Sequence, residues 1–369
     1  MPIALALSLI ILQALVLIVH LAVYAAAATV FFPENPHFQV FQALFIALSF
    51  TLISATFLSH WFDGVFTRAY YKFSVYWFGL VHFLFGGVVI FYFVANAFYS
   101  RNYYVSPNLL VGIVFAIFFL IHLYGTVRSG RADVTRINVT LPNLPSAWRD
   151  KRIVFLSDVH LGHVRGAHFM AKIVRKIQAL TPEAVLIGGD LYDGVRCEVA
   201  EIIEPLRTLR PPRGVYFVTG NHEYFLKNVD EAFAAIKNVG IRILHNEKVD
   251  LSGIELIGVD YKTTHKKEAL AQTLARIHTK SDKPSILLKH EPDHLEVIHK
   301  AGVSLTLAGH THRGQIFPLN FFTWQIYKGF DYGLKRLGEA WVYTSSGVGT
   351  WGPPLRLGTK SEIILITFK

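Results

Sequence analysis

The stretch Lys151-Arg152-Ile153-Val154-Phe155-Leu156-Ser157-Asp158-Val159-His160-Leu161-Gly162 decides how the second part of the chain folds. Its first half is β-branched and apolar, which predicts a buried strand. Side chains at positions i and i+2 point to the same face of a strand, so Asp158 and His160 are expected to leave its end together. A carboxylate and an imidazole suit a divalent metal such as Mn, Fe, Zn or Ni. Taken alone, this pair is equally compatible with a strand-end turn that binds nothing.

The chain divides into an apolar part and a charged part. The first 127 of its 369 residues contain only five charged side chains, Arg68, Lys72, Arg101, Glu34 and Asp63. The remainder holds 33 of the 36 basic and 24 of the 26 acidic residues, and it is long enough for one sizeable core. We therefore expect a transmembrane domain over 1–127, a linker with the first strand over 128–150, and a soluble domain over 151–369.

Four apolar stretches in the first part are long enough to cross a membrane. They cover about 3–32, 40–61, 73–98 and 109–127. The turn Pro33–Pro36 separates the first two, and a loop with Arg68 and Lys72 separates the next pair. The positive-inside rule places this loop and the soluble domain on the cytoplasmic side of the inner (cell) membrane.

Four histidines lie in or at the ends of these stretches: His20, His60, His82 and His122. A proton path or an intramembrane metal site would use such residues. Histidines that are partnered by neighbouring helices explain them as well, and we favour this interpretation.

The net charge of +10 lies almost wholly in the soluble part. It favours anionic partners, such as a bilayer surface or a phosphorylated substrate. No basic motif interleaved with aromatic residues indicates nucleic acid, so no nucleic-acid partner is expected. Cys197 is the only cysteine, which excludes an internal disulfide and fits a reducing compartment.

Strand-like and helical patterns alternate in the soluble part, which predicts an α/β fold. Strand-like runs lie at 137–141, 152–157, 184–188, 214–218, 241–243, 249–251, 254–258, 284–289, 304–308, 340–344 and 363–368. Helical patterns lie at 168–180, 198–209, 229–238 and 267–278.

Four further strands end as the first one does, with a metal-capable side chain. The endings are Gly188-Gly189-Asp190, Gly220-Asn221-His222-Glu223, His290-Glu291-Pro292 and Gly309-His310-Thr311-His312. Open α/β sheets assemble their sites beyond the carboxyl ends of their strands. Chance supplies one or two such placements, but it does not account for five in one domain.

In this order the five blocks resemble the calcineurin-like metallophosphoesterase superfamily over about 150–369. The segments 310–315 and 346–350 are similar to its membrane-associated bacterial branch. The resemblance implies a four-layer α-β-β-α sandwich, here preceded by an all-α bundle of four transmembrane helices. It also implies a metal-dependent phosphoric ester hydrolase with two divalent ions, Mn being expected first among Mn, Fe, Zn and Ni.

The resemblance also implies roles for individual residues. The first metal would be held by Asp158, His160 and His312, the second by Asn221, His290 and His310, and both by a bridging Asp190. Two cations about 3.5–4 Å apart can clamp a phosphate and stabilise the attacking and leaving oxygens. Beside the catalytic Asp190, His222 would stabilise or protonate the leaving oxygen.

Other polar residues near the blocks have less specific expectations. Glu223 would orient His222, and Asp193 would act likewise near the bridge, although ordinary capping or surface carboxylates explain both equally well. His163, Arg165 and Arg313 are candidates for contact with phosphate, and a plain loop role stays open for the first two.

Residues 316–337, directly after the last block, are rich in aromatic residues and include Lys328, Lys335 and Arg336. They predict contact with a bilayer or with an acyl chain, or else they fill core. We expect a cytoplasm-facing hydrolase of a phosphodiester or pyrophosphate bond in a lipid-linked substrate, for example a UDP-diacylglucosamine-type pyrophosphatase. The alternatives are a tethered phosphomonoesterase or nucleotide phosphodiesterase, and a non-catalytic metal-binding scaffold.

Overall fold

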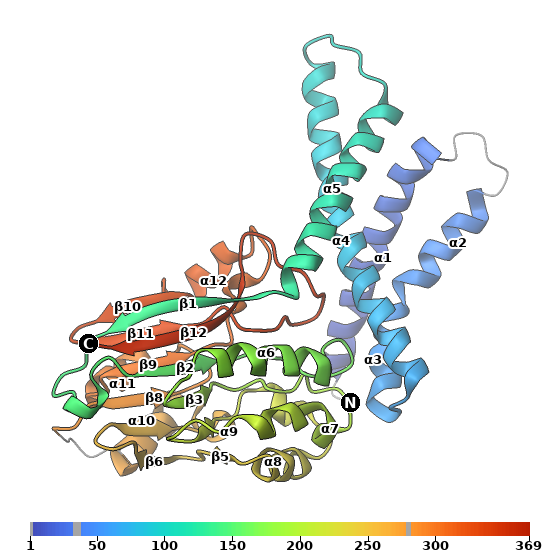
Figure 1. Cartoon of the computed structure of the whole chain (residues 1–369). Helices are drawn as coiled ribbons and strands as arrows, with labels where there is room; N and C mark the ends of the chain where they lie inside the picture. The colour runs from blue at the N-terminus through green and yellow to red at the C-terminus, as the bar shows by residue number, and fades with distance from the viewer. Residues whose placement is uncertain (1–2, 32–37, 278–281) are drawn as a thin grey trace. The chain divides into compact units, whose positions relative to one another are not determined.

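A computed structural model describes residues 3–31, 38–277 and 282–369. The chain forms two compact units (Figure 1). The first is a membrane unit, Met1–Val127 with Gly352–Leu355. The second, Arg128–Trp351 with Arg356–Lys369, contains the five blocks of the expected catalytic site, and we call it the catalytic unit. The turn expected at Pro33–Pro36 lies outside the described residues.

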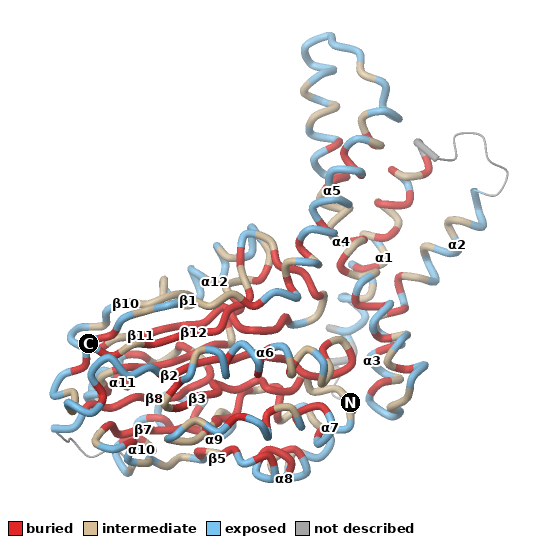
Figure 2. Tube along the Cα trace, in the orientation of Figure 1, coloured by how far each residue is buried: buried red, intermediate tan, exposed pale blue. Residues whose placement is uncertain are grey.

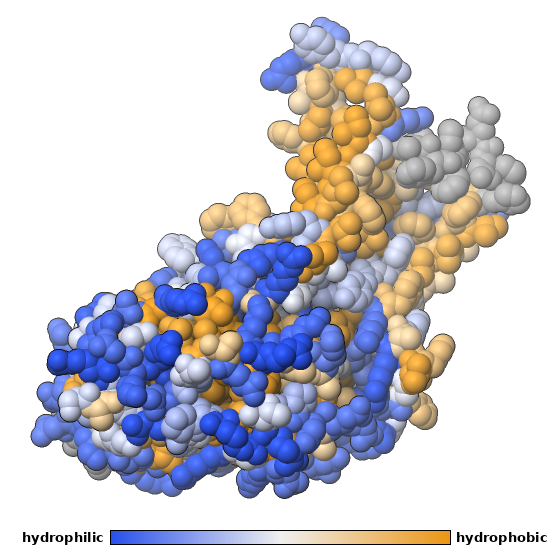
Figure 3. Space-filling model, viewed as in Figure 1, coloured by the Kyte–Doolittle hydropathy of each residue, from blue (hydrophilic) through white to orange (hydrophobic). Residues whose placement is uncertain are grey.

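The membrane unit consists of α1 (Ile3–Phe31), α2 (Phe38–Ser49), α3 (Thr51–Trp61), α4 (Val65–Tyr99) and α5 (Pro107–Ser129). Four segments are long and apolar enough to cross a membrane, since α2 and α3 together form one of them. This confirms the four expected helices, and Figure 3 shows hydrophobic residues concentrated on them. The third membrane-spanning helix, α4, starts earlier than the hydropathy pattern predicts. The prediction that Arg68 and Lys72 lie in a loop is therefore wrong, because both residues lie in α4. The Arg68 side chain pairs with the Asp63 carboxylate at 2.7 Å.

Two of the membrane-unit histidines have partners within the unit. Trp77 Nε1 donates to His20 Nε2 at 3.0 Å, while His20 Nδ1 lies 2.8 Å from the Val16 carbonyl. His82 Nδ1 lies 2.8 Å from the carbonyl of Phe78. These contacts agree with the interpretation of partnered histidines.

The catalytic unit is built on two six-stranded sheets. The first contains β1 (Ala132–Val139), β12 (Ser361–Phe368), β2 (Arg152–Leu156), β3 (Ala184–Ile187), β4 (Val215–Phe217) and β5 (Ile241–Ile243), in that spatial order. The second contains β10 (Gly333–Leu337), β11 (Ala340–Thr344), β9 (Leu305–Ala308), β8 (Ser285–Leu288), β7 (Glu255–Gly258) and β6 (Glu247–Asp250). Strands β2 to β5 run parallel, as do β7, β8 and β9.

Seven α-helices accompany the sheets in the described part of this unit: α6 (Ala167–Ala179), α7 (Val199–Ile203), α8 (Val229–Asn238), α9 (Tyr261–Thr264), α10 (Lys267–Ile277), α11 (Leu295–Ala301) and α12 (Asn320–Ile326). One helical pattern, 198–209, is split: α7 is followed by a 3-10 turn, Glu204–Thr208. Pro205 stands at the start of that turn, where its missing N–H ends the α-helical hydrogen-bond ladder.

The alternation of side chains along β2 shows how the layers stack. Val154 and Leu156 pack in a core with residues of α6, whereas Ile153 and Phe155 pack between the two sheets with residues of β8 and β9. A third core lies between the second sheet and helices α10 and α11. The expected α-β-β-α sandwich is thus confirmed, and both sheets are buried along most of their length (Figure 2).

The first strand begins earlier than its apolar pattern predicts. It was expected over 137–141, but β1 starts at Ala132 and pairs in parallel with β12 from Ala132↔Ser361 to Val139↔Phe368. The polar residues in its first half give no apolar strand pattern in the sequence. This half is a strand because it forms backbone hydrogen bonds with β12.

The fully buried Trp148 tests the packing between the sheets. Its Nε1 donates to the carbonyl of Leu251 at 2.7 Å, and its ring meets Phe368 edge-on at 5.6 Å. Replacing Trp148 by Ala should destabilise the domain by about 3–5 kcal/mol and lower the Tm by about 6–20 °C. Circular dichroism of the full chain in detergent measures this change. Trp324→Ala, at a site that is 60% exposed, is the control, and an equal loss in both variants would contradict the packing account.

Candidate metal centre

The metal-capable side chains follow the carboxyl ends of β2, β3, β4, β8 and β9, which are neighbours within their sheets. Five of these residues are non-glycine residues with a left-handed backbone: Asp158, His160, Asp190, His310 and His312 have φ between +47° and +68°. Such a conformation is costly for residues with a side chain, and its clustering is typical of functional sites.

Two glycines let the carboxylates approach the backbone. A Cβ on Gly220 would lie 2.1 Å from Asp190 Oδ1, and one on Gly309 would lie 2.2 Å from Asp158 Oδ2. No other residue type fits at either position without moving a carboxylate.

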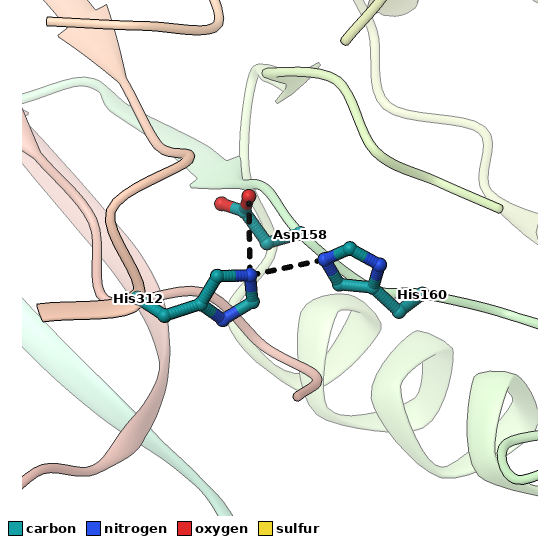
Figure 4. A group of neighbouring side chains, drawn as sticks. All are labelled: Asp158, His160 and His312. Atoms are coloured by element: carbon teal, nitrogen blue, oxygen red, sulfur yellow. Dashed lines mark hydrogen bonds and ion pairs between the residues drawn. The ribbon is translucent and has the colours of Figure 1, made fainter. Parts of the chain in front are cut away.

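Asp158, His160 and His312 form the first group of candidate ligands (Figure 4). The Nε2 atoms of the two histidines are 3.0 Å apart, and His312 Nε2 lies 3.7 Å from Asp158 Oδ1. The backbone N–H of His310 donates to both oxygens of Asp158, at 2.9 and 3.1 Å. All three side chains are buried and converge on one point.

Asp190, His290 and His310 form the second group, with Asn221 beside it. His310 Nδ1 lies 3.1 Å from His290 Nε2, and Asn221 Oδ1 lies within 3.2 Å of both nitrogens. An amide oxygen next to two imidazoles and a carboxylate is a mixed N and O ligand set suited to a borderline divalent metal.

Asp190 stands between the two groups. Its Oδ2 lies 3.2 Å from His290 Nε2 and 3.8 Å from His160 Nε2, while Oδ1 accepts from the backbone N–H of His222 at 2.9 Å. Burial alone would raise the pKa of this carboxyl, but the charge and hydrogen bond of His290 hold it well below its usual value. Asp190 therefore stays ionised where one oxygen faces both groups.

The outer nitrogens of three histidines are held by other parts of the chain. His160 Nδ1 lies 3.2 Å from Asp193 Oδ1, His290 Nδ1 lies 2.9 Å from the Gly188 carbonyl, and His310 Nε2 lies 3.0 Å from Glu291 Oε1. Such contacts orient metal-binding imidazoles and select their tautomer. Each ring thus directs its remaining nitrogen to the centre.

Protonation within the two groups is uneven. Burial lowers the pKa of His310 to about 3 and that of His312 well below its usual value. Burial also opposes a charge on His290, but Asp190 raises its pKa to about 10. Imidazole nitrogens and buried carboxylates thus face one another across each group, which is the position that a cation would occupy. The donor set fits a divalent metal in both groups.

His222 lies at the edge of the centre. Its Nδ1 lies 2.9 Å from the carbonyl of Asp193, so this nitrogen carries a proton and Nε2 stays available. Its ring meets that of His160 edge-on at 4.6 Å, and burial lowers its pKa. His160, Asp193 and His222 form a third group of close ligand atoms, which the contacts of Asp193 with the two histidines explain.

Glu223 caps backbone N–H groups, which is one of the two roles that the sequence left open for it. Its buried carboxylate accepts from four backbone N–H groups, those of Asp190, Leu191, Tyr192 and Gly220, at 2.6–3.2 Å. Burial and the charge of Asp190 raise its pKa to about 7. Glu223 thus joins the loops after β3 and β4, while the backbone carbonyl of Asp193 holds the His222 ring.

Arg356 and Glu291 support the ligands of the centre, although no sequence pattern predicts a role for them. The buried guanidinium of Arg356 donates to the carbonyls of His312, Ser346 and Gly349 at 2.6–2.9 Å. Burial, followed by the charge of Arg165, lowers its pKa to about 9. The Glu291 carboxylate could have been suspected from its position next to His290, but Arg356 stands far along the chain and carries no local signal.

The three candidates for phosphate contact have different surroundings. Arg165 is buried and donates to the Ser129 carbonyl and to Thr350 Oγ1 at 3.0 and 2.9 Å, so its guanidinium braces the fold. His163 is buried as well. Arg313 is half-buried with its Cζ 4.3 Å above the ring of Tyr332, directly after His312.

Known proteins resemble this chain over the region of the centre. The calcineurin-like phosphoesterase family matches residues 151–314, which include all seven candidate ligands. An uncharacterized metallophosphoesterase of Campylobacter jejuni is 33% identical over 272 residues, which are 71% of this chain and 71% of that protein. The bovine transmembrane protein with metallophosphoesterase domain is 37% identical over 250 residues, covering 62% of this chain and 55% of the relative.

A third relative, an uncharacterized metallophosphoesterase of Helicobacter pylori, is 35% identical over 219 residues, covering 58% of this chain and 59% of that protein. The chain thus spans less than two thirds of the bovine and Helicobacter relatives. The resemblance inferred from the five blocks is confirmed, and the relatives with the four apolar helices indicate an integral membrane protein.

Substituting Arg356 by Met tests whether this guanidinium supports the ligand His312. The change removes one donor from each of three carbonyls and should weaken metal binding by about 10–100-fold, the usual effect of losing a contact behind a ligand. Competition with a chelating dye on the full-length protein measures the affinity. Arg242→Met, at an arginine whose side chain is 54% exposed, is the matched control. Equal affinities in both variants would rule out the supporting role.

Proposed function

The chain belongs to the calcineurin-like metallophosphoesterases, which are metal-dependent phosphoester hydrolases, and from this premise we propose a membrane-anchored hydrolase of a phosphodiester or pyrophosphate bond. The observation that supports the proposal best is the position of Asp190. One of its oxygens faces His160 of the first group and His290 of the second, at 3.8 and 3.2 Å.

We assign one divalent ion to Asp158, His160 and His312, a second to Asn221, His290 and His310, and Asp190 to both. When bound, the two ions hold the phosphate oxygens and activate the attacking water. Asn221 adds a ligand without adding negative charge, which keeps the centre attractive to phosphate. Nitrogen and oxygen donors suit Mn, Fe, Zn and Ni, and we propose Mn first.

His222 is assigned to the leaving oxygen. Because Nδ1 keeps its proton on the Asp193 carbonyl, Nε2 is the atom at which the ring would take up a proton and give it to the leaving oxygen. The adjacent Asn221 belongs to the second group, and side chains of adjacent residues diverge. His222 therefore sits beside the metals without sharing them, where it can protonate or stabilise the leaving group.

A lipid-linked substrate is the finer part of the proposal. Four apolar helices attach the chain to a bilayer, and an exposed apolar segment, 317–326, directly follows the His310–His312 block. Together with the basic soluble part, these features favour an anionic lipid at the cytoplasmic face of the inner membrane, for example a UDP-diacylglucosamine-type pyrophosphate.

Hydrolysis of two soluble substrates tests the reaction class. The full-length protein in detergent should cleave bis-p-nitrophenyl phosphate with Mn present, and both a chelator and Asp190→Ala should abolish the activity. Cleavage of p-nitrophenyl phosphate alone would instead favour a phosphomonoesterase. Two bound metals without turnover of either compound or of a lipid pyrophosphate would contradict an enzyme and favour a scaffold.

The role of His222 has its own test. His222→Ala should keep both metals and reduce turnover by about a hundredfold or more, the scale of lost general acid catalysis. Metal analysis and diester hydrolysis are measured on the same samples. His168→Ala, at an exposed histidine on α6, is the control. A His222→Ala variant with full metal content and an unchanged rate would refute the assignment.

A further inference from the structure

An apolar patch stands out on the surface of the catalytic unit. Its members, Phe317, Leu319, Phe321, Phe322, Trp324 and Ile326, are 47–68% exposed. Among the described residues of this unit, only Phe225 and Trp351 are other large hydrophobic side chains of comparable exposure. Helix α12, which carries most of the patch, has no buried residue. The alternative that these aromatics fill core is therefore wrong.

The patch is attached to the metal centre. The Thr323 hydroxyl on α12 donates to the Asp331 carboxylate at 3.2 Å, and the carbonyl of Asp331 accepts from Thr311, between His310 and His312, at 2.7 Å. Tyr327, at the end of the helix, places its ring 6.4 Å from that of His310. The exposed side chains thus stand on a segment that is hydrogen-bonded to the ligand block.

Basic residues border the patch. Lys328 is exposed at the end of α12, and Lys335 Nζ and Trp324 Nε1 would lie 3.9 and 3.4 Å from a Cβ placed on Gly329. The one acidic residue in 316–337 is Asp331, which is buried. Exposed Trp, Phe and Leu side chains with neighbouring lysines are the composition of elements that lie in the interface of an anionic bilayer.

We propose that α12 inserts its apolar patch into the interfacial layer of the bilayer to which the chain is anchored. Only Gly130 and Arg131 separate the end of α5 from the start of β1, so the catalytic unit is tethered near lipid at high effective concentration. A hydrophobic peptide or a second copy would not require the basic border, whereas anionic headgroups do. The inference goes beyond the proposed function, because bilayer contact does not depend on which bond is cut.

Lipid quenching of a site-specific label tests the insertion in the full-length protein. Cys197→Ser removes the only thiol, and Phe322→Cys then accepts a bimane label; Gln272→Cys, at an exposed polar position on α10, is the matched control. Both proteins are reconstituted in phosphatidylcholine and phosphatidylglycerol at about 2:1, with and without brominated acyl chains. Several-fold stronger quenching at the α12 position is expected. Equal quenching at both positions would overturn the proposal.

Two further measurements distinguish lipid insertion from self-association and test the basic border. In detergent, shielding of the label at position 322 from a water-soluble quencher could rise with protein concentration. Such a rise would indicate a second copy of the chain on the patch and would contradict lipid insertion. Lys328→Glu with Lys335→Glu should reduce the quenching when phosphatidylglycerol is present, and an unchanged signal would refute the role of the basic border. Diester hydrolysis in detergent reports independently whether the protein is folded. Absent quenching with intact hydrolysis would contradict the membrane insertion of α12 but not the proposed function. Quenching without hydrolysis would contradict the proposed function but not the insertion.

Discussion

The structure of the centre depends on two buried carboxylates whose negative charges must be balanced by neighbouring groups. Asp158 and Asp190 are almost completely inaccessible to solvent, and burial disfavours their charge. The imidazoles that face these carboxylates offset part of this cost, and a divalent cation would offset it more strongly. The sandwich brings the carboxyl ends of five strands from both sheets to one place, and the metal-capable side chains therefore converge there.

The surrounding chain holds this arrangement against its cost. Several ligands sit in a left-handed backbone conformation, which tertiary contacts must stabilise. Glu223 ties the loops after β3 and β4 through four N–H groups, and Arg356 ties the last ligand block to the loop after β11. Both charged groups are buried and serve the backbone near the ligands, so they stiffen the centre without joining it.

The sequence allowed the parts of this account that depend on local periodicity. Buried strands that end in Asp, Asn or His predicted both the α/β fold and the convergence of the seven side chains. The contact of Arg356 with the carbonyl of His312 joins residues far apart in the chain, and no local pattern announces it. The sequence could not predict whether α12 is exposed, because an aromatic segment has the same composition whether it packs in the core or contacts lipid.

The sharing of Asp190 by two metal ions is the central claim, and counting metals tests it most directly. The full-length protein, loaded with Mn, freed of excess metal and analysed by inductively coupled plasma mass spectrometry against amino-acid analysis, should contain two ions per chain. A content of one ion, saturable and unchanged by more metal, would contradict the shared centre.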